Sequence, residues 1–256
     1  MLGDTQETEP KESVPMTAHT KRKIIHYWRR QIRPILVLVL VFTSFRSVFA
    51  DWNDVPTGSM KPTIFEGDRI FVNKLAYGLK FPYTTWHLAE WSGPKPGEVV
   101  IFYSPDDGIR LVKRVVGTPG DHIQSRDGFL TINGKPLEYD DYEPATNADL
   151  PRDQQTGFRF YTEHLGDHAH VVAFNNNRPS IRDFQFTLKH KGEDGATEDQ
   201  YFMMGDNRDN SKDSRYFKQH YVNRDQILGR ANRVIFSLDY DDSYLPRKNR
   251  FFHALK

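Results

Sequence analysis

Cysteine is absent from this 256-residue chain, and that absence excludes several kinds of protein. Without thiols the chain has no cysteine nucleophile, no thiolate-bound zinc site and no disulfide framework. Net charge is nearly absent too: 35 basic residues stand against 34 acidic ones, so no global field favours nucleic acid as a partner. A chain of this length buries enough surface to be stable without crosslinks. Its function must therefore be sought in local patterns.

Acidic residues are missing from one long stretch, Ser13 to Ala50. Six of the positions 21–33 are basic, and the wholly apolar run Ile35–Phe42 follows them. A basic flank before an apolar run is typical of a signal anchor whose N-terminus stays in the cytoplasm. We therefore expect a cytoplasmic tail over 1–33, a single transmembrane helix over 34–50 and an exported catalytic domain over 51–256.

Two other interpretations of the apolar stretch stay open. Sixteen helical residues reach roughly 24 Å, less than a hydrocarbon core of about 30 Å, so a buried helix of a soluble protein is one of them. The other is a signal peptide cleaved after Ala50, because small residues occupy both ends of Val48-Phe49-Ala50. Arg46 lies in the stretch that a cleavage site keeps neutral, and this favours a retained anchor.

After residue 50 the sequence indicates a mainly β protein. Short apolar runs alternate with turns rich in Gly, Pro, Asn and Asp, and no long amphipathic helix stands out. Asn133-Gly134 predicts a tight hairpin. We expect a compact, barrel-like β-sheet core with an inserted β-rich subdomain over 121–200, where the chain turns polar. The clearest predicted strands are Arg69–Asn73, Glu98–Tyr103, Ile109–Val116, Phe129–Ile132, Tyr201–Met204 and Arg230–Ser237.

Ser59 is a candidate nucleophile in the segment Val55–Thr63. Gly58 permits a tight turn that exposes the hydroxyl, and Pro56 and Pro62 stiffen its flanks. A serine hydroxyl needs a base to become nucleophilic. By itself, however, such a serine is more often an ordinary turn residue, and no histidine falls in a motif that connects it to this serine.

Lys113 is a candidate base, because a lysine can serve when burial lowers its pKa. With a strand period of two, Lys113 shares the apolar face of Leu111 and Val115, whereas Arg110 and Arg114 point the other way. A lysine at a sheet edge that reaches solvent remains the alternative. If the two residues form a dyad, atoms 54 positions apart in sequence must meet within about 3 Å.

A third stretch, Met204–Arg215, concentrates short polar side chains and opposite charges in twelve residues. Such a loop can orient a buried lysine through hydroxyls and stabilise itself through Asp–Arg pairs. Its spacing does not match a calcium-binding EF-hand. A solvated turn is the other interpretation.

Taken in order, these stretches resemble the motif boxes of the type I signal peptidases, the bacterial leader peptidase family. Thr57–Thr63 resembles the nucleophile box, Gly67–Lys74 the next, Lys113–Asp121 the general-base box and Gly205–Arg215 the last. In one departure, Tyr216-Phe217-Lys218 stands where relatives commonly have Trp-Gly. The resemblance covers most of residues 35–121 and 201–237.

The resemblance implies a serine endopeptidase with a Ser/Lys dyad and no metal or cofactor. Ser59 would be acylated and Lys113 would act as general base. The Ser59 N–H and the Thr57 hydroxyl would form the oxyanion hole, and Ser211 would position the lysine amine. The residues expected to support the site are Asp206, Arg208, Asp213 and Arg215.

The resemblance also implies substrate and location. A signal peptidase I of the bacterial cytoplasmic membrane would cut exported preproteins on the outer, periplasmic side, after small residues at −1 and −3. Its partners would be signal peptides and membrane lipid, not nucleic acid, and we expect a monomer. Two alternatives remain: a LexA-like self-cleaving Ser/Lys protease, which shares part of the fold, and an inactive exported domain that binds peptides.

Overall fold

The computed structural model describes residues 26–48, 50–81, 84, 87–143, 154–177, 180–240 and 242–255. Most of the predicted tail, residues 1–25, and Phe49 of the candidate cleavage motif lie outside them. The chain divides into two compact units, Met1–Phe45 and Arg46–Lys256.

The described part of the first unit is helical. A π-helical turn, η1 (Trp28–Ile32), leads into α2 (Arg33–Val48), close to the predicted bounds 34–50. Side chains from Ile35 to Phe42 are each at least half exposed. No helix among the described residues combines the length and the apolar character needed to cross a membrane.

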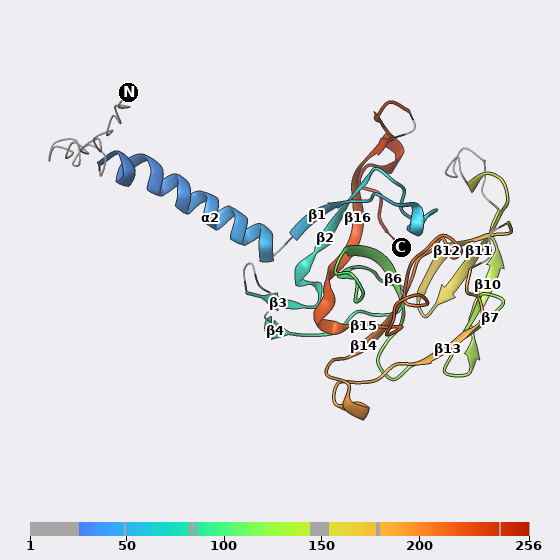
Figure 1. The fold of residues 1–256 in the computed structure, drawn as a ribbon. Coiled ribbons are helices and arrows are strands. Elements are labelled where there is room, and N and C mark those ends of the chain that lie inside the picture. The colour runs from blue at the N-terminus through green and yellow to red at the C-terminus, as the bar shows by residue number, and fades with distance from the viewer. Residues whose placement is uncertain are drawn as a thin grey trace, which may run out of the picture. The chain divides into compact units, whose positions relative to one another are not determined.

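The second unit is mainly β, as the sequence predicts (Figure 1). Its main sheet has eight strands in the order β1-β2-β16-β5-β6-β14-β15, with β17 paired to β16. These strands are β1 (Ala50–Asp54), β2 (Asp68–Asn73), β5 (Val99–Tyr103), β6 (Arg110–Gly117), β14 (Gln200–Met204), β15 (Val222–Asn223), β16 (Ile227–Asp239) and β17 (Leu245–Pro246).

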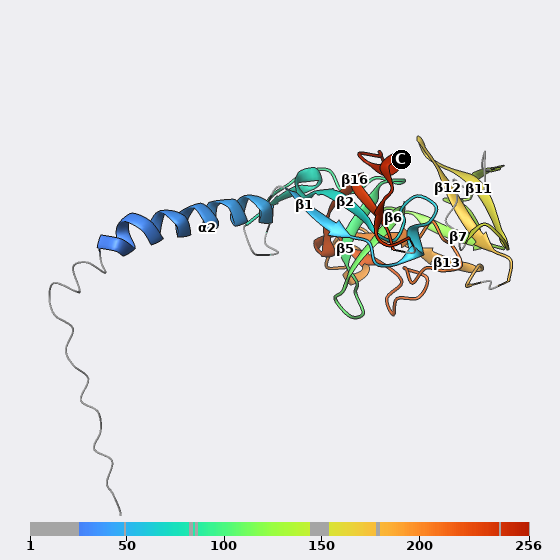
Figure 2. The ribbon, with the colours of Figure 1, turned by 90° about the horizontal axis from the view of Figure 1, so that it is seen from above.

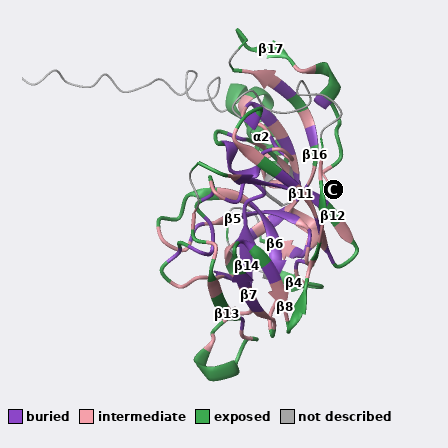
Figure 3. Ribbon diagram, turned by 90° about the vertical axis from the view of Figure 1, so that its right-hand side faces the viewer, coloured by how far each residue is buried: buried purple, intermediate pink, exposed green. Residues whose placement is uncertain are grey.

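The main sheet is curled, and β16 is the reason. This 13-residue strand pairs with both β2 and β5 and carries register shifts at Ala231/Arg233, Val234/Phe236 and Ile227/Gly229. Such bulges bend a strand and increase its twist. The apolar sequences of β5 and β14 fit strands covered on both faces, and β5, β6 and β14 are largely buried (Figure 3).

Between β6 and β14, which are neighbours in the main sheet, the chain forms two further sheets. We call their strands, His122 to Thr187, the insert. In Figures 1 and 2 they lie on the side of β6 and β14 away from β1. One sheet has the order β13-β7-β8-β9 and the other β10-β11-β12. The strands are β7 (His122–Arg126), β8 (Phe129–Ile132), β9 (Lys135–Pro136), β10 (Glu138–Asp141), β11 (Phe158–Leu165), β12 (His168–Asn175) and β13 (Phe184–Thr187).

The predicted turn at Asn133-Gly134 is present, and it joins β8 to β9. Both residues have positive φ, 52° and 76°, which asparagine and glycine tolerate best. After residue 50 the described helices are short 3₁₀ turns. The remaining elements are a two-stranded sheet of β3 (Gly78–Lys80) and β4 (His87–Glu90), with η2 (Gly58–Met60), η3 (Lys74–Ala76), η6 (Glu193–Gly195), η7 (Arg224–Gln226) and η8 (Lys248–Arg250).

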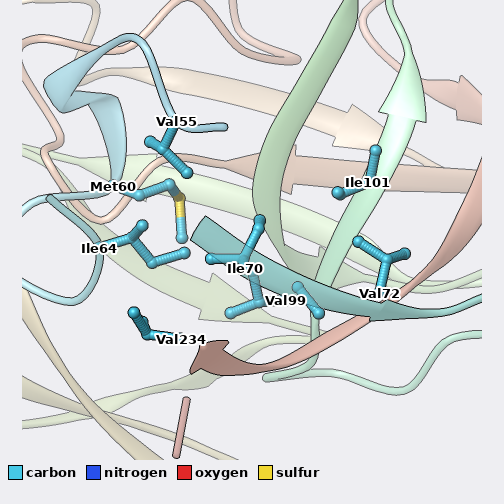
Figure 4. Packing of buried hydrophobic residues seen from close by; sticks show 9 residues of the cluster. Val55, Met60, Ile64, Ile70, Val72, Val99, Ile101 and Val234 are labelled. Atoms are coloured by element: carbon cyan, nitrogen blue, oxygen red, sulfur yellow. The ribbon is translucent and has the colours of Figure 1, made fainter. Parts of the chain in front are cut away.

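One hydrophobic cluster fixes the η2 turn against the main sheet. Met60 on η2 and Ile64 just after it pack with Ile70 of β2 and Val234 of β16, and all four side chains are almost fully buried (Figure 4). Burying such a side chain contributes about 1.5–3 kcal/mol. Ser59, which lies between Gly58 and Met60 on η2, is therefore held at a defined place beside the sheet.

Candidate active site

The η2 turn presents Ser59 beside the sheet. Thr57 is extended before the turn, and the Lys61 N–H closes it on the Gly58 carbonyl at 3.1 Å. A Cβ at Gly58 would lie 2.9 Å from Lys61 Cδ and 3.2 Å from Glu66 Oε1, so a larger residue would have to displace the Lys61 and Glu66 side chains. The predicted turn at Ser59 is present, but Ser59 is buried rather than exposed, because the turn packs against the main sheet.

Strand β6 brings Lys113 to the same place. Its Nζ lies 2.7 Å from Ser59 Oγ and donates to the Val112 carbonyl at 2.9 Å. The residues are 54 positions apart, and their separation is within the distance that a dyad requires. The Lys113 side chain is 2% exposed, so it does not reach solvent at a sheet edge.

Burial lowers the pKa of Lys113 from 10.5 to about 8. The carboxylates of Asp213 and Asp206 act in the opposite direction, and Arg215 reinforces the lowering. The shift corresponds to roughly 3 kcal/mol against the charged amine. An appreciable fraction of the amine is thus neutral near neutral pH and able to accept a proton.

The two hydroxyls expected to assist the dyad differ in their surroundings. Thr57 is exposed, its Oγ1 lies 3.5 Å from Ser59 Oγ, and its side chain makes no hydrogen bond that caps the turn. Ser211 is buried close to Gly205, where a Cβ would meet Ser211 Oγ at 2.3 Å. No hydrogen bond joins Ser211 to Lys113, whose amine has Ser59 and Val112 as partners.

The burial of Arg114 is not what the alternation of side chains along β6 predicts. It points away from Lys113 but is 1% exposed, because Asp206 meets it in the interior. Its Nε and Nη2 donate to the two carboxylate oxygens at 2.9 and 2.7 Å, and Thr63 Oγ1 donates to the same carboxylate at 2.6 Å. Burial alone would raise the pKa of Asp206, but Arg114 outweighs it and the pKa is lowered. Only Arg110 on this face is exposed.

The other supporting residues expected from sequence are also buried and paired. Arg215 holds Asp213 through two bonds of 2.8 Å. Arg208 instead donates to Glu163 of β11 at 2.7 Å, and Glu163 also accepts from the Tyr139 hydroxyl. Arg208 therefore connects the last motif to the insert rather than to Asp206.

Sequence analysis missed the residues that the insert contributes. Glu163 and His170 are cross-strand partners on β11 and β12 and face Arg208 and Asp206. His170 is buried, with its Nε2 3.3 Å from Glu163 Oε1, and burial lowers its pKa. A buried carboxylate in a polar segment has no sequence signal until its arginine is known. Among the described residues, no group of three or more His, Asp or Glu is placed to hold a metal ion.

Asn207 is a further residue to which the sequence assigned no role. It is fully buried, its N–H donates to the Ser59 carbonyl and its Nδ2 to the Gly58 carbonyl, both at 3.1 Å. The signal that could have found it is its place inside the Met204–Arg215 stretch.

Comparison of the sequence with known proteins identifies its family. Residues 28–236 match the family described as signal peptidase, peptidase S26. Signal peptidase I of Pseudomonas aeruginosa is 33% identical over 96% of this chain and 84% of that protein. Signal peptidase I of Pseudomonas fluorescens is 33% identical over 93% and 82%. A crystal structure of a signal peptidase I from Enterococcus faecalis is 25% identical over 54% of this chain and 97% of that one, with a TM-score of 0.31. From its sequence, this chain belongs to the signal peptidase family, peptidase S26.

Proposed function

We propose that this protein is a signal peptidase I, a serine endopeptidase that removes N-terminal signal peptides from exported preproteins through an acyl-enzyme on Ser59. The observation that carries the proposal is the 2.7 Å separation between Lys113 Nζ and Ser59 Oγ, together with the burial that lowers the pKa of the amine to about 8. The family match and the names of the relatives supply the substrate class.

In the proposed mechanism the neutral Lys113 amine accepts the Ser59 proton while Oγ attacks the scissile carbonyl carbon. The Ser59 N–H and the Thr57 hydroxyl donate to the oxyanion that forms. Collapse breaks the C–N bond, and the Lys113 ammonium returns the proton to the leaving amine. Lys113 then takes a proton from the water that attacks the ester. When the C–O bond breaks, Lys113 returns this proton to Ser59 Oγ and the signal peptide leaves as a carboxylic acid.

The buried polar groups around the dyad have supporting roles in this proposal. Asp206 and Asp213 each accept two hydrogen bonds from an arginine, so neither is free to pair with the Lys113 amine. This pairing leaves burial as the dominant influence on the lysine. Ser211 is buried beside Gly205, and we propose that it positions the Lys113 amine when substrate is bound.

We also propose that the chain is anchored in the cytoplasmic membrane by its N-terminal helical region, with 51–256 on the outer side and 121–200 as an inserted subdomain. Support comes from the exposed apolar side chains of Ile35–Phe42 and from the basic residues before them. Protease added to intact spheroplasts should digest the catalytic region and spare an N-terminal tag. Digestion of the tag, or protection of the catalytic region, would contradict this topology.

The full-length protein in detergent should cleave a peptide with alanine at −1 and −3, in the presence or absence of EDTA. Ser59→Ala and Lys113→Ala should each reduce turnover to background, and Lys212→Ala, which removes an exposed lysine amine, should not. Near-normal turnover in either dyad variant would contradict the proposal. A LexA-like protease would cut its own chain and leave the added peptide intact, whereas a peptide-binding domain would bind the peptide without cutting it.

A further inference from the structure

Asn207 contacts both peptide groups that flank the nucleophile. Its side-chain Nδ2 donates to the Gly58 carbonyl and its backbone N–H donates to the Ser59 carbonyl, each at 3.1 Å. Asn207 is 149 residues from Gly58 in sequence and fully buried. The two bonds therefore hold the backbone of the η2 turn from a distant segment.

The bond to Gly58 also helps to fix the direction of the Ser59 N–H, because Asn207 is a second donor to a carbonyl that already accepts from the Lys61 N–H. A trans peptide group is planar, with its C=O and N–H pointing in opposite directions. Because the Gly58 carbonyl points at Asn207, the N–H of the same peptide group, which belongs to Ser59, must point away from it. The first N–H groups of a helical turn have no partner within the turn, and Thr57 does not cap this one with its side chain.

The side-chain carbonyl oxygen of Asn207 indicates that the amide is needed for its donor. Its Oδ1 is buried without a hydrogen-bond partner among the described residues. Leaving such an acceptor unsatisfied typically costs about 1–3 kcal/mol. The opposite orientation of the amide would place Oδ1 against the Gly58 carbonyl oxygen, so the donor side is the side that the turn requires.

The insert holds Asn207 in turn. The Ala173 N–H of β12 donates to the Asp206 carbonyl, and the Arg208 N–H donates to the Ala173 carbonyl, both at 2.8 Å. These bonds make a short parallel bridge between Ala173 and Asn207. The backbone on either side of Asn207 is thus fixed by a strand of the insert.

We propose that Asn207 is a positioning residue for the oxyanion hole: it aims the Ser59 N–H at the developing oxyanion, and the insert holds it there through β12. The inference rests on the proposed acylation of Ser59. It assigns the insert a role in catalysis that is independent of any contact with substrate.

The test uses the full-length protein and two variants. Asn207→Asp keeps the shape but places a carboxylate against the Gly58 carbonyl, and Asn207→Ala removes the donor. Each should lower kcat by about 10²-fold, as loss of an oxyanion-hole donor does, with KM changed less than about twofold. The affinity for a peptide aldehyde, whose adduct with Ser59 carries the same oxygen, should fall by a similar factor. In Asn207→Ala, which adds no charge near Lys113, the pH midpoint of kcat/KM should stay in place.

The matched control is Asn176→Asp, an exposed asparagine at the end of β12, which should behave as wild type. If Asn207→Asp does not fold, the kcat of Asn207→Ala decides the test. A wild-type kcat in Asn207→Ala, or a raised KM at constant kcat, would overturn the inference. Loss of activity in Ser59→Ala together with wild-type kcat in Asn207→Ala would overturn this inference alone, whereas activity in Ser59→Ala would overturn the proposed function.

Discussion

Lys113 and Arg114 are neighbours on β6, and the structure places their positive charges in opposite situations. The Lys113 amine meets a hydroxyl and a carbonyl, and burial lowers its pKa to about 8. Arg114 meets the Asp206 carboxylate through two charge-assisted bonds. Arg208 and Arg215 are likewise paired, with Glu163 and Asp213. Burial thus makes one cation able to lose its proton, whereas pairing keeps the other three charged.

This difference is what a Ser/Lys mechanism needs. A base must be neutral for part of the time, and an arginine cannot become neutral in a protein. If Asp206 were not paired with Arg114, its carboxylate would stabilise the ammonium form of Lys113 more strongly, since it already raises the pKa of that amine. In the proposed mechanism the paired arginines therefore protect Lys113 from the carboxylates beside it.

Lys113→Arg should have the largest effect, because it puts a permanent charge where the dyad needs a neutral base. We expect kcat/KM to fall by about 10²–10⁴-fold, the range attributed to general base catalysis. Arg110→Lys, an exchange at an exposed position of the same strand, is the matched control and should be near wild type. Substantial turnover by Lys113→Arg would contradict the distinction between Lys113, which must become neutral, and Arg114, which stays charged.

Asp206→Asn should be the most damaging change on the paired side. Leaving a buried arginine without its carboxylate typically costs about 3–5 kcal/mol, to be measured as the free energy of unfolding in urea. The control is Asp194→Asn, whose carboxylate is exposed and pairs with the half-buried Lys189, because a surface pair contributes at most about 1 kcal/mol. Equal losses in the two variants would show that burial of the Asp206 pair is not what makes it important.

Thr57→Val should reduce activity without disturbing Lys113 or the paired arginines. It removes a hydroxyl on the solvent side of Ser59, and loss of one oxyanion donor typically lowers kcat by about 10²–10³-fold. Thr57→Ser keeps the hydroxyl and should retain most of the activity. Undiminished kcat in Thr57→Val would rule out the oxyanion role and leave the dyad assignment intact.

The smallest expected effect is the change of kcat/KM with pH. Because Lys113 must be neutral, kcat/KM should rise about tenfold per unit below its pKa and level off above about 8. The folded-state pKa lies below the ordinary 10.5, so the unfolded chain holds more protons between about 8 and 10.5 and the free energy of unfolding should rise with pH there. In Lys113→Ala that rise should shrink. A pH-independent rate between 6 and 8 would contradict a lysine base.

Much of the fold was predictable because it depends on short-range patterns. The predicted strands at 69–73, 98–103, 109–116 and 230–237 coincide with β2, β5, β6 and β16 to within a few residues at their ends. The hairpin at Asn133-Gly134 follows from two residues that tolerate positive φ. The sequence did not predict the separate strands β10–β13. Their sequences mix charged and apolar residues, and their burial depends on the neighbouring sheet.

The candidate site was predictable in part. A strand period of two made Lys113 a candidate inward-facing lysine, and a glycine-containing turn made Ser59 a candidate nucleophile. The resemblance to the signal peptidase motifs selected these two residues over the alternatives. The same periodicity could not place Arg114, because Asp206, which draws it into the interior, lies 92 residues away. It also could not connect Arg208 to Glu163, or predict that Ser211 would make no hydrogen bond to the lysine amine.

The sequence by itself determined most strands of the main sheet, the position of the turn that carries Ser59 and the face of β6 that carries Lys113. These properties follow from backbone preferences and from the alternation of side chains along one strand. Only the tertiary structure decided the charge state of each buried group and the direction of the Ser59 peptide. Both depend on partners such as Asp206, Glu163 and Asn207, which folding brings across tens of residues to within hydrogen-bond distance.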